Sequence, residues 1–302
     1  MDNRYTITFQ VTAPVLLRSA LQGYGISKKA LTAIKFRGGE ITVNGVEQNV
    51  RHKLLAGDTV VVKFPREAVS DGLQPEDGEL HIVYEDDEIL VLNKPPYQSS
   101  IPSHVHLEGS IAGIVAGYFQ RRNIPSTVHV VNRLDRDTSG LMCIAKHRHV
   151  HHVLSEQQKA HDIYREYEAI VHGHIDEDEA SIIAPIGRKA DSIIERAVCE
   201  DGQFAHTDYR VLQRFTYEGE AITHVRLRLH TGRTHQIRVH MSYIQHPLVG
   251  DDLYGGRHVG IDRQALHCVY LHLYHPLTHE PMSWQATLPE DFRRLLPAHS
   301  VD

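Results

Sequence analysis

The stretch His129–Ala145, which reads HVVNRLDRDTSGLMCIA, concentrates residues suited to chemistry. Two apolar runs flank a polar centre, and this pattern predicts two buried strands joined by a charged loop. Catalytic groups are often held on such loops by a rigid sheet. Asp135 in this loop is a candidate nucleophile or general base, because an ionised carboxylate can attack a carbon atom or accept a proton. The alternative is a polar hairpin in which Gly140 serves the bend.

Two other patterns offer weaker signals. Residues 231–240 read TGRTHQIRVH, in which Gly232 precedes an amphipathic segment, as in some phosphate-binding helix N-termini. His147 and His151 would share one face of a helix, as zinc ligands can. No adjacent Glu or Asp completes a metallohydrolase pattern, so no metal site is predicted.

Length and composition limit the class of protein. A chain of 302 residues has room for one large domain and one small domain. Its three cysteines, Cys143, Cys199 and Cys268, are far apart and odd in number, which argues against a disulfide framework. No apolar run approaches the roughly 18 residues that cross a membrane, and the first ten residues do not resemble a secretory signal. We therefore expect a cytoplasmic protein without a membrane partner.

Charge is unevenly distributed along the chain, whose net charge is −6. Residues 1–66 contain ten Lys/Arg and four Asp/Glu, whereas residues 67–128 contain three Lys/Arg and ten Asp/Glu. Because polyanions respond to a local positive field, the N-terminal part is a candidate RNA-binding unit. The polar segment 67–79 contains two Gly and one Pro and predicts a linker. The expected units are thus a domain at 1–66, a linker at 67–79 and a domain at 80–302.

The N-terminal unit shows two short amphipathic patterns within residues 15–37, with Ser27 as a candidate N-cap of the second helix. Strands are expected at 41–46, around an Asn44-Gly45 turn, and at 59–64. This order, with Val-Asn-Gly followed later by Gly-Asp-Thr-Val-Val-Val, resembles the alpha-L RNA-binding module found in ribosomal protein uS4. The residues expected to contact RNA phosphates are Lys28, Lys29, Lys35, Arg37, Arg51 and Lys53. The alternative is a solvated basic helix face.

The remainder of the chain contains several motifs in order. They are RLDRDTSGL at 133–141, RxYxAxVxG at 165–173 and TGRTHQIRVH at 231–240, with Asn-Lys-Pro at 93–95 and HPLVGDxLYG at 246–255. Together they resemble the RluA/RluD-type pseudouridine synthases over residues 80–293. Asn132 stands where that family usually has His, and Arg165 where it usually has Lys.

The resemblance implies roles for individual residues. The implied catalytic residues are Asp135, Tyr167 and Arg238, and the implied substrate-binding residues are Arg133, Leu134 and Ile237. Asp135 corresponds to the catalytic carboxylate, Tyr167 to the aromatic that packs against the target base, and Arg238 to the cation paired with the carboxylate. Without the resemblance, a Tyr in an alternating strand is a half-buried structural residue. The implied fold is α+β, with a mixed, largely antiparallel sheet preceded by the small RNA-binding domain.

The predicted function is isomerisation of uridine to pseudouridine in structured RNA by a monomeric enzyme. The reaction breaks the bond from ribose to the base nitrogen, rotates the uracil and rejoins it through carbon 5, so no cofactor is predicted. The base must first be flipped out of the stacked RNA. The expected substrate is 23S ribosomal RNA, and transfer RNA is the alternative. Two other classes stay open: a non-catalytic RNA-binding or ribosome-assembly factor on the same fold, and a zinc hydrolase.

Overall fold

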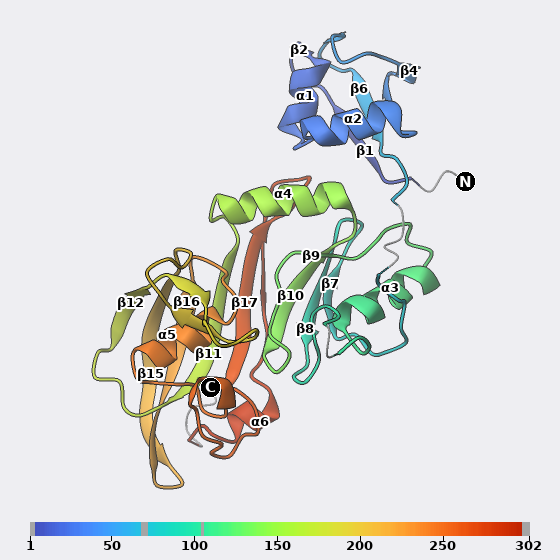
Figure 1. The fold of residues 1–302 in the computed structure, drawn as a ribbon. Helices are drawn as coiled ribbons and strands as arrows, with labels where there is room; N and C mark the ends of the chain where they lie inside the picture. Colours follow the sequence, from blue (N-terminus) through green and yellow to red (C-terminus); the bar gives the residue numbers. More distant parts are fainter. Residues whose placement is uncertain (1–3, 68–71, 104–105, 298–302) are drawn as a thin grey trace.

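The strands of the computed structural model form a small N-terminal sheet, a large sheet and two short two-stranded ribbons (Figure 1). The structure describes residues 4–67, 72–103 and 106–297. Residues 68–71 of the predicted linker therefore lie outside the described part of the chain, as do residues 1–3 and 298–302 at the two ends of the chain. None of the helices in these three ranges is long and apolar enough to cross a membrane.

The N-terminal sheet is antiparallel, with the strand order β1-β6-β3-β4. These strands are β1 (Thr6–Gln10), β6 (Thr59–Lys63), β3 (Glu40–Val43) and β4 (Val46–Glu47). A separate ribbon joins β2 (Val15–Leu16) to β5 (Lys53–Leu54), and two helices complete the unit, α1 (Leu17–Gly23) and α2 (Lys28–Phe36). The Ser27 hydroxyl accepts a hydrogen bond from the Ala30 N–H at 3.2 Å, which confirms the predicted N-cap.

The large sheet has ten strands in the order β12-β15-β16-β11-β17-β10-β8-β7, with β18 beside β17 and β9 beside β10. The first half comprises β12 (Glu179–Ile183), β15 (His206–Tyr217), β16 (Glu220–Leu229), β11 (Tyr164–His172) and β17 (Leu266–Tyr274). The second comprises β10 (Ser139–Ala145), β8 (Ile89–Lys94), β7 (Ile82–Glu85), β18 (Pro281–Gln285) and β9 (His129–Val130). Only the pairing of β10 with β17 is parallel in this sheet of described residues. A mixed, largely antiparallel sheet was predicted and is confirmed.

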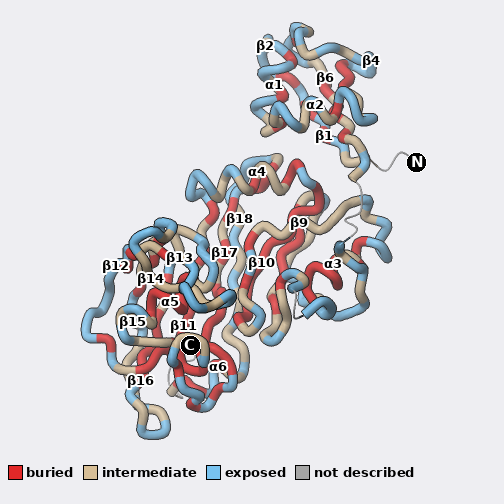
Figure 2. The backbone as a smooth tube through the Cα atoms, in the orientation of Figure 1, coloured by how far each residue is buried: buried red, intermediate tan, exposed pale blue. Residues whose placement is uncertain are grey.

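Helices cover both faces of β8 and β10. Residues of even number, such as Leu92 and Met142, pack against α3 (Ile111–Arg121), whereas Val91 and Cys143 on the other face belong to the main core with α4 (Arg148–Lys159). This alternation follows from the two-residue period of a strand, and Figure 2 shows β10 buried along its length. The remaining elements are α5 (Gln236–Tyr243), α6 (Glu290–Arg293), the 3-10 helix η1 (Asp252–Tyr254) and the ribbon of β13 (Ile186–Arg188) and β14 (Arg196–Val198).

The N-terminal unit stands apart from the large sheet, beyond α4 (Figure 1). At the junction the Tyr5 ring stacks on His147, with 4.2 Å between ring centroids. The side chain of Glu67, the first residue of the predicted linker, is buried, and its carboxylate lies 2.7 Å from His129 Nε2 and accepts the Arg148 N–H at 2.7 Å. At the other end, the Glu76 N–H donates to the Gly113 carbonyl on α3. Both ends of the predicted linker are therefore bound to the larger unit.

Candidate active site

Asp135 lies in the polar loop that joins β9 to β10. The parallel contact of β10 with β17 fixes where this loop ends, because Gly140 has φ +113° and a Cβ there would lie 2.4 Å from the Cys268 carbonyl oxygen. Only glycine fits this position. The predicted arrangement of strand, loop and strand is confirmed, and Gly140 serves a close approach of two backbones.

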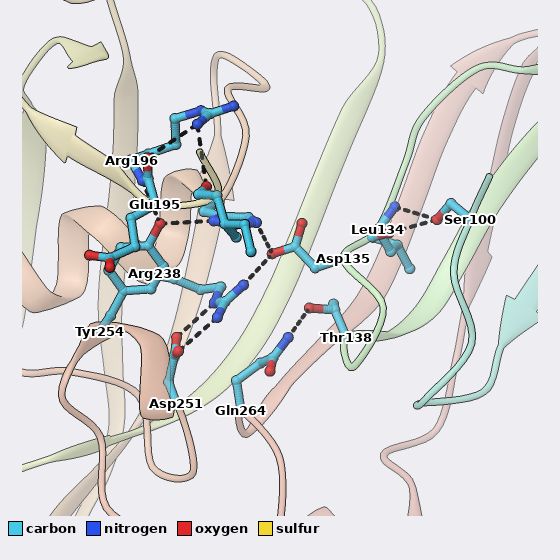
Figure 3. Close-up of polar contacts among 12 residues, drawn as sticks. Ser100, Leu134, Asp135, Thr138, Glu195, Arg196, Arg238, Asp251, Tyr254 and Gln264 are labelled. Carbon is cyan, nitrogen blue, oxygen red and sulfur yellow. Dashed lines mark hydrogen bonds and ion pairs between the residues drawn. The ribbon is translucent and has the colours of Figure 1, made fainter. Parts of the chain in front are cut away.

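Side chains from outside the loop hold its backbone. The Ser100 hydroxyl donates to the Leu134 carbonyl at 2.6 Å and accepts the Leu134 N–H at 3.0 Å (Figure 3). The buried Lys94 ammonium donates to three carbonyls, one of which belongs to Arg136 in the loop at 2.9 Å. Asp135 therefore lies between two residues whose carbonyl oxygens are bound by buried donors.

Asn132, which replaces the usual His, is also part of this support. Its side chain is buried, accepts the Cys143 N–H at 2.8 Å and donates to the Leu141 carbonyl at 3.3 Å. These two bonds connect the start of the loop to β10. Asn132 thus positions the loop backbone, and its side chain is occupied by backbone groups.

Arg238 on α5 connects Asp135 to a second carboxylate. Its Nη1 donates to Asp135 Oδ2 at 3.0 Å, while Nε and Nη2 donate to the two oxygens of Asp251, each at 2.7 Å (Figure 3). The Asp251 side chain is fully buried, and that of Asp135 is 27% exposed. A bidentate pair of this kind fixes the guanidinium plane. Asp251 therefore orients Arg238 so that its remaining donor points to Asp135.

The charges of the two carboxylates also act on Arg238. Burial alone would lower the pKa of Arg238, but its bonds to Asp251 and the charges of Asp135 and Asp251 outweigh burial and raise the pKa. The guanidinium therefore stays protonated beside Asp135. Among described residues, Asp135 Oδ1 accepts no hydrogen bond, so this oxygen is available to a substrate.

All six site residues predicted in the catalytic part of the chain line one cavity. They are Arg133, Leu134, Asp135, Tyr167, Ile237 and Arg238. Tyr167 comes from β11 and is buried, and burial raises the pKa of its hydroxyl, which keeps the phenol neutral. The cavity thus combines one carboxylate with three arginines, Arg133, Arg233 and Arg238, and with apolar or aromatic walls.

His235 is the N-cap residue of α5 and also lines this cavity. It has φ +57°, its Nδ1 is 2.8 Å from the Tyr254 hydroxyl, and its Nε2 is 3.9 Å from Asp135 Oδ2. Burial lowers the pKa of this imidazole, so it is neutral near pH 7. His235 is therefore a polar neighbour of Asp135 without a competing charge.

The six cations predicted to contact RNA lie in the N-terminal unit, on α2 and on the segment around β5. All six side chains are exposed, and within the described ranges none forms an ion pair. They are Lys28, Lys29, Lys35, Arg37, Arg51 and Lys53. The structure does not bring them to the cavity, so the two sets of residues would contact different parts of a large ligand.

Two groups of side chains have the donor types of a metal site. One comprises His206, Asp208 and His230, and the other Asp86, Glu88 and His275. His147 belongs to neither group, and its Nδ1 instead accepts the His149 N–H at 3.1 Å at the start of α4. The stacked rings of His206 and His230 each place Nε2 against the Asp208 carboxylate, at 2.9 and 2.5 Å, so these nitrogens are already used in contacts with Asp208.

Four residues that the structure connects to Asp135 received no site role from their sequence patterns. They are Lys94, Ser100, His235 and Asp251. Lys94 and Asp251 lie inside motifs, which was the one available signal, but their partners are remote in sequence. Ser100 lies 34 residues before its partner, in a segment without a recognisable pattern.

Comparison with known proteins gives one consistent result. The model of the family described as RNA pseudouridylate synthase matches residues 88–243. An uncharacterized RNA pseudouridine synthase of Bacillus subtilis, YjbO, is 52% identical over 272 residues, covering 90% of this chain and 95% of the relative. The ribosomal large subunit pseudouridine synthase D of Pseudomonas aeruginosa is 39% identical over 305 residues, covering 96% and 93%. The solved structure of human RNA pseudouridylate synthase domain containing 1 has a TM-score of 0.58 at 29% identity, covering 70% of this chain and 86% of that one.

Proposed function

The chain belongs to the RNA pseudouridylate synthase family, and on this basis we propose that it isomerises specific uridines of 23S ribosomal RNA with Asp135 as the catalytic carboxylate. The observation that supports this role is the position of Asp135 in the cavity. It is bound through one oxygen to the oriented Arg238, and its other oxygen is free of hydrogen bonds within the described chain. The names of several relatives support a ribosomal substrate.

The chemistry follows from this arrangement. An ionised Asp135 acts either as a nucleophile, at the anomeric carbon of ribose or at carbon 6 of uracil, or as a base toward a sugar proton. Each route requires one carboxylate oxygen directed at the nucleoside and a negative charge that persists in a partly buried site. The ion pair with Arg238 at 3.0 Å supplies the compensating charge while leaving Oδ1 for the reaction.

The walls of the cavity fit a base removed from its stack. A flipped uracil loses stacking partners at a cost of a few kcal/mol, which protein groups must replace. Tyr167 offers an aromatic face, and Leu134 and Ile237 offer apolar contacts in the same cavity. These side chains can thus hold the neutral base next to Asp135, in a cavity that Arg133 and Arg238 also line.

The N-terminal unit has the properties of an accessory RNA-binding domain. Its six predicted contact residues are exposed and form no ion pairs within the described ranges, so their charges are available to phosphates. The N-terminal unit that carries them stands apart from the large sheet (Figure 1). We assign them to RNA outside the target nucleotide, where phosphate contacts position the enzyme without reading sequence.

The experiment that tests this function maps pseudouridines in ribosomal and transfer RNA from cells that lack the protein, complemented with wild type or with Asp135→Asn. The proposal expects one or a few sites in 23S ribosomal RNA to disappear and only the wild type to restore them. Restoration by Asp135→Asn would refute the catalytic role. Loss of sites in transfer RNA instead would identify the other substrate class.

If the maps are unchanged while the purified protein still binds ribosomal RNA, the RNA-binding factor becomes the better description. The catalytic proposal would then require formation of pseudouridine by the purified protein on an unmodified 23S transcript. Absence of product in that assay as well would overturn it.

A further inference from the structure

A second cavity, of about 370 Å³, adjoins the pocket of Asp135 at the ends of α4, β11 and β16. We call it the arginine cleft, and its charged and amide lining residues are Gln158, Lys159, Arg165, Arg228 and Arg233. Leu229 and Arg233 line both cavities, so the two are neighbours with a common wall. A ligand in the pocket can therefore extend into the cleft.

The arginine cleft is strongly positive. Four of its lining residues are Lys or Arg, two are His, and none is Asp or Glu, although the chain as a whole carries a net charge of −6. The Arg228 guanidinium lies over the Tyr164 ring at 4.4 Å, and Glu156 on α4 pairs with Lys159 at 2.7 Å. This concentration of one charge sign in a concave site favours an anionic ligand.

Arg165 is a buried cation of the cleft whose guanidinium has no partner among the described residues. It is 6% exposed, and within the described chain its guanidinium forms no hydrogen bond and no ion pair, with Nε fully enclosed. Buried charges are normally paired, because desolvation of an unpaired charge is costly. An anion bound in the cleft would complete the interactions of this guanidinium.

Further donors lie next to Arg165. A Cβ on Gly232 would lie 3.4 Å from Arg165 Nη2 and 3.9 Å from Gln158 Nε2, so these two nitrogens approach the same side of Gly232. Among described residues, the Gln158 side chain forms no hydrogen bond either. A larger residue at position 232 would fill the space between the donors and the loop. The cleft therefore offers several unused N–H groups around one point.

The position of Arg165 on β11 relates the cleft to the reacting base. Arg165 and Tyr167 are two residues apart on one strand and both are buried, so their side chains share a face about 7 Å apart along the strand. A base packed on Tyr167 would thus place the phosphate of an adjoining nucleotide within reach of Arg165. Arginine binds phosphate oxygens through two parallel donors.

We propose that the arginine cleft binds a backbone phosphate of the substrate RNA next to the target uridine, with Arg165 as its main ligand. The proposal rests on RNA being the substrate of the neighbouring pocket. It explains why a guanidinium is buried without a protein partner two residues from Tyr167. Arg165 is then a substrate-binding residue, and Arg233 contributes from the wall between the two cavities.

The test compares wild type with Arg165→Met, Arg165→Lys and the control Arg210→Gln, which alters an exposed arginine of β15 that lines neither cavity. The probe is an unmodified transcript of 23S ribosomal RNA, and the measurements are filter binding from about 50 to 200 mM salt and single-turnover formation of pseudouridine. We expect Arg165→Met to weaken binding about tenfold and to reduce the slope of log affinity against log salt by about 0.7 to 0.9, the contribution of one phosphate contact. Arg165→Lys should recover part of both effects.

Several outcomes would overturn the proposal. Unchanged affinity and an unchanged salt slope in Arg165→Met would contradict a phosphate contact. If the affinity is unchanged and only the maximal rate falls, the arginine acts by positioning Tyr167, and the proposal is again refuted. If Arg165→Met does not fold, Arg233→Gln, an exposed side chain on the common wall, must show the reduced slope. The binding assay does not depend on catalysis, so failure of the wild type to form pseudouridine would refute the proposed activity while the salt slopes still decide on the phosphate contact.

Discussion

The buried pair of Arg238 and Asp251 should separate stability from catalysis. Arg238→Met leaves the fully buried Asp251 carboxylate without its two donors, and Asp251→Leu leaves the buried guanidinium with Asp135 as its remaining partner. Removing one partner of a buried ion pair costs about 3 to 5 kcal/mol of unfolding free energy, whereas replacing both partners by apolar groups is often neutral. We therefore expect each single variant to lose about 3 kcal/mol or more, and the double variant to regain most of that loss.

Catalytic activity should not return with stability. In the double variant Asp135 lacks the cation at 3.0 Å that compensates its charge in the folded protein. Loss of one oriented electrostatic partner typically lowers a rate about 100-fold or more. Urea unfolding monitored by circular dichroism gives the free energies, and single-turnover formation of pseudouridine gives the rates. A double variant that reacts at the wild-type rate, or single variants within about 1 kcal/mol of wild type, would refute this reasoning.

Three further predictions concern Tyr167 in the pocket, Lys94 beside the loop and Glu67 at the junction with the N-terminal unit. Tyr167→Phe should react at close to the wild-type rate, because the aromatic face is retained. Tyr167→Leu should react more than about tenfold slower, since stacking on a base contributes about 1 to 3 kcal/mol. Equal rates for both variants in single-turnover assays would argue against a stacking role. Lys94→Met should lower the unfolding free energy by roughly 3 kcal/mol and slow the reaction, because three carbonyls around the loop lose their buried donor. A urea midpoint and a reaction rate equal to those of wild type would contradict this prediction. For Glu67, burial alone would raise the carboxyl pKa, but the hydrogen bond from His129 and the charge of His147 lower the pKa from 4.5 to about 2. Because the pKa is lower in the folded state, the stabilisation by Glu67 is present above pH 4.5 and is lost as the pH falls toward 2. The difference in unfolding free energy between wild type and Glu67→Gln, measured by urea unfolding, should therefore shrink in that window. A difference that does not change with pH would show that the ionised carboxylate contributes nothing.

The sequence predicted the local elements around the site because their patterns are local. An apolar run indicated β10, alternation around Tyr167 indicated β11, and Ser27 indicated the start of α2. The residues lining the pocket came from the order of three motifs that resemble one family, and no periodicity places Asp135 next to Arg238, which is 103 residues away.

What the sequence could not predict are contacts that depend on the packed fold. Asp251 is an ordinary acidic residue of a loop motif until α5 places Arg238 against it. The role of Asn132 likewise depends on its distance from the backbone of β10, which residue type alone does not reveal. Arg165 appeared only as a variant of a motif usually written with Lys, and its lack of a protein partner is a property of the folded chain. Long-range hydrogen bonds and burial have no local signature.

The most direct test of the proposed catalysis compares Asp135→Asn with the matched variant Asp137→Asn, whose carboxylate pairs with Arg136 in the same loop. Both proteins are folded and mixed with an unmodified 23S transcript, and pseudouridine is quantified at the uridine that wild type modifies. The proposal predicts no detectable product with Asp135→Asn and substantial product with Asp137→Asn. Product formed by Asp135→Asn at a rate close to that of wild type would contradict it.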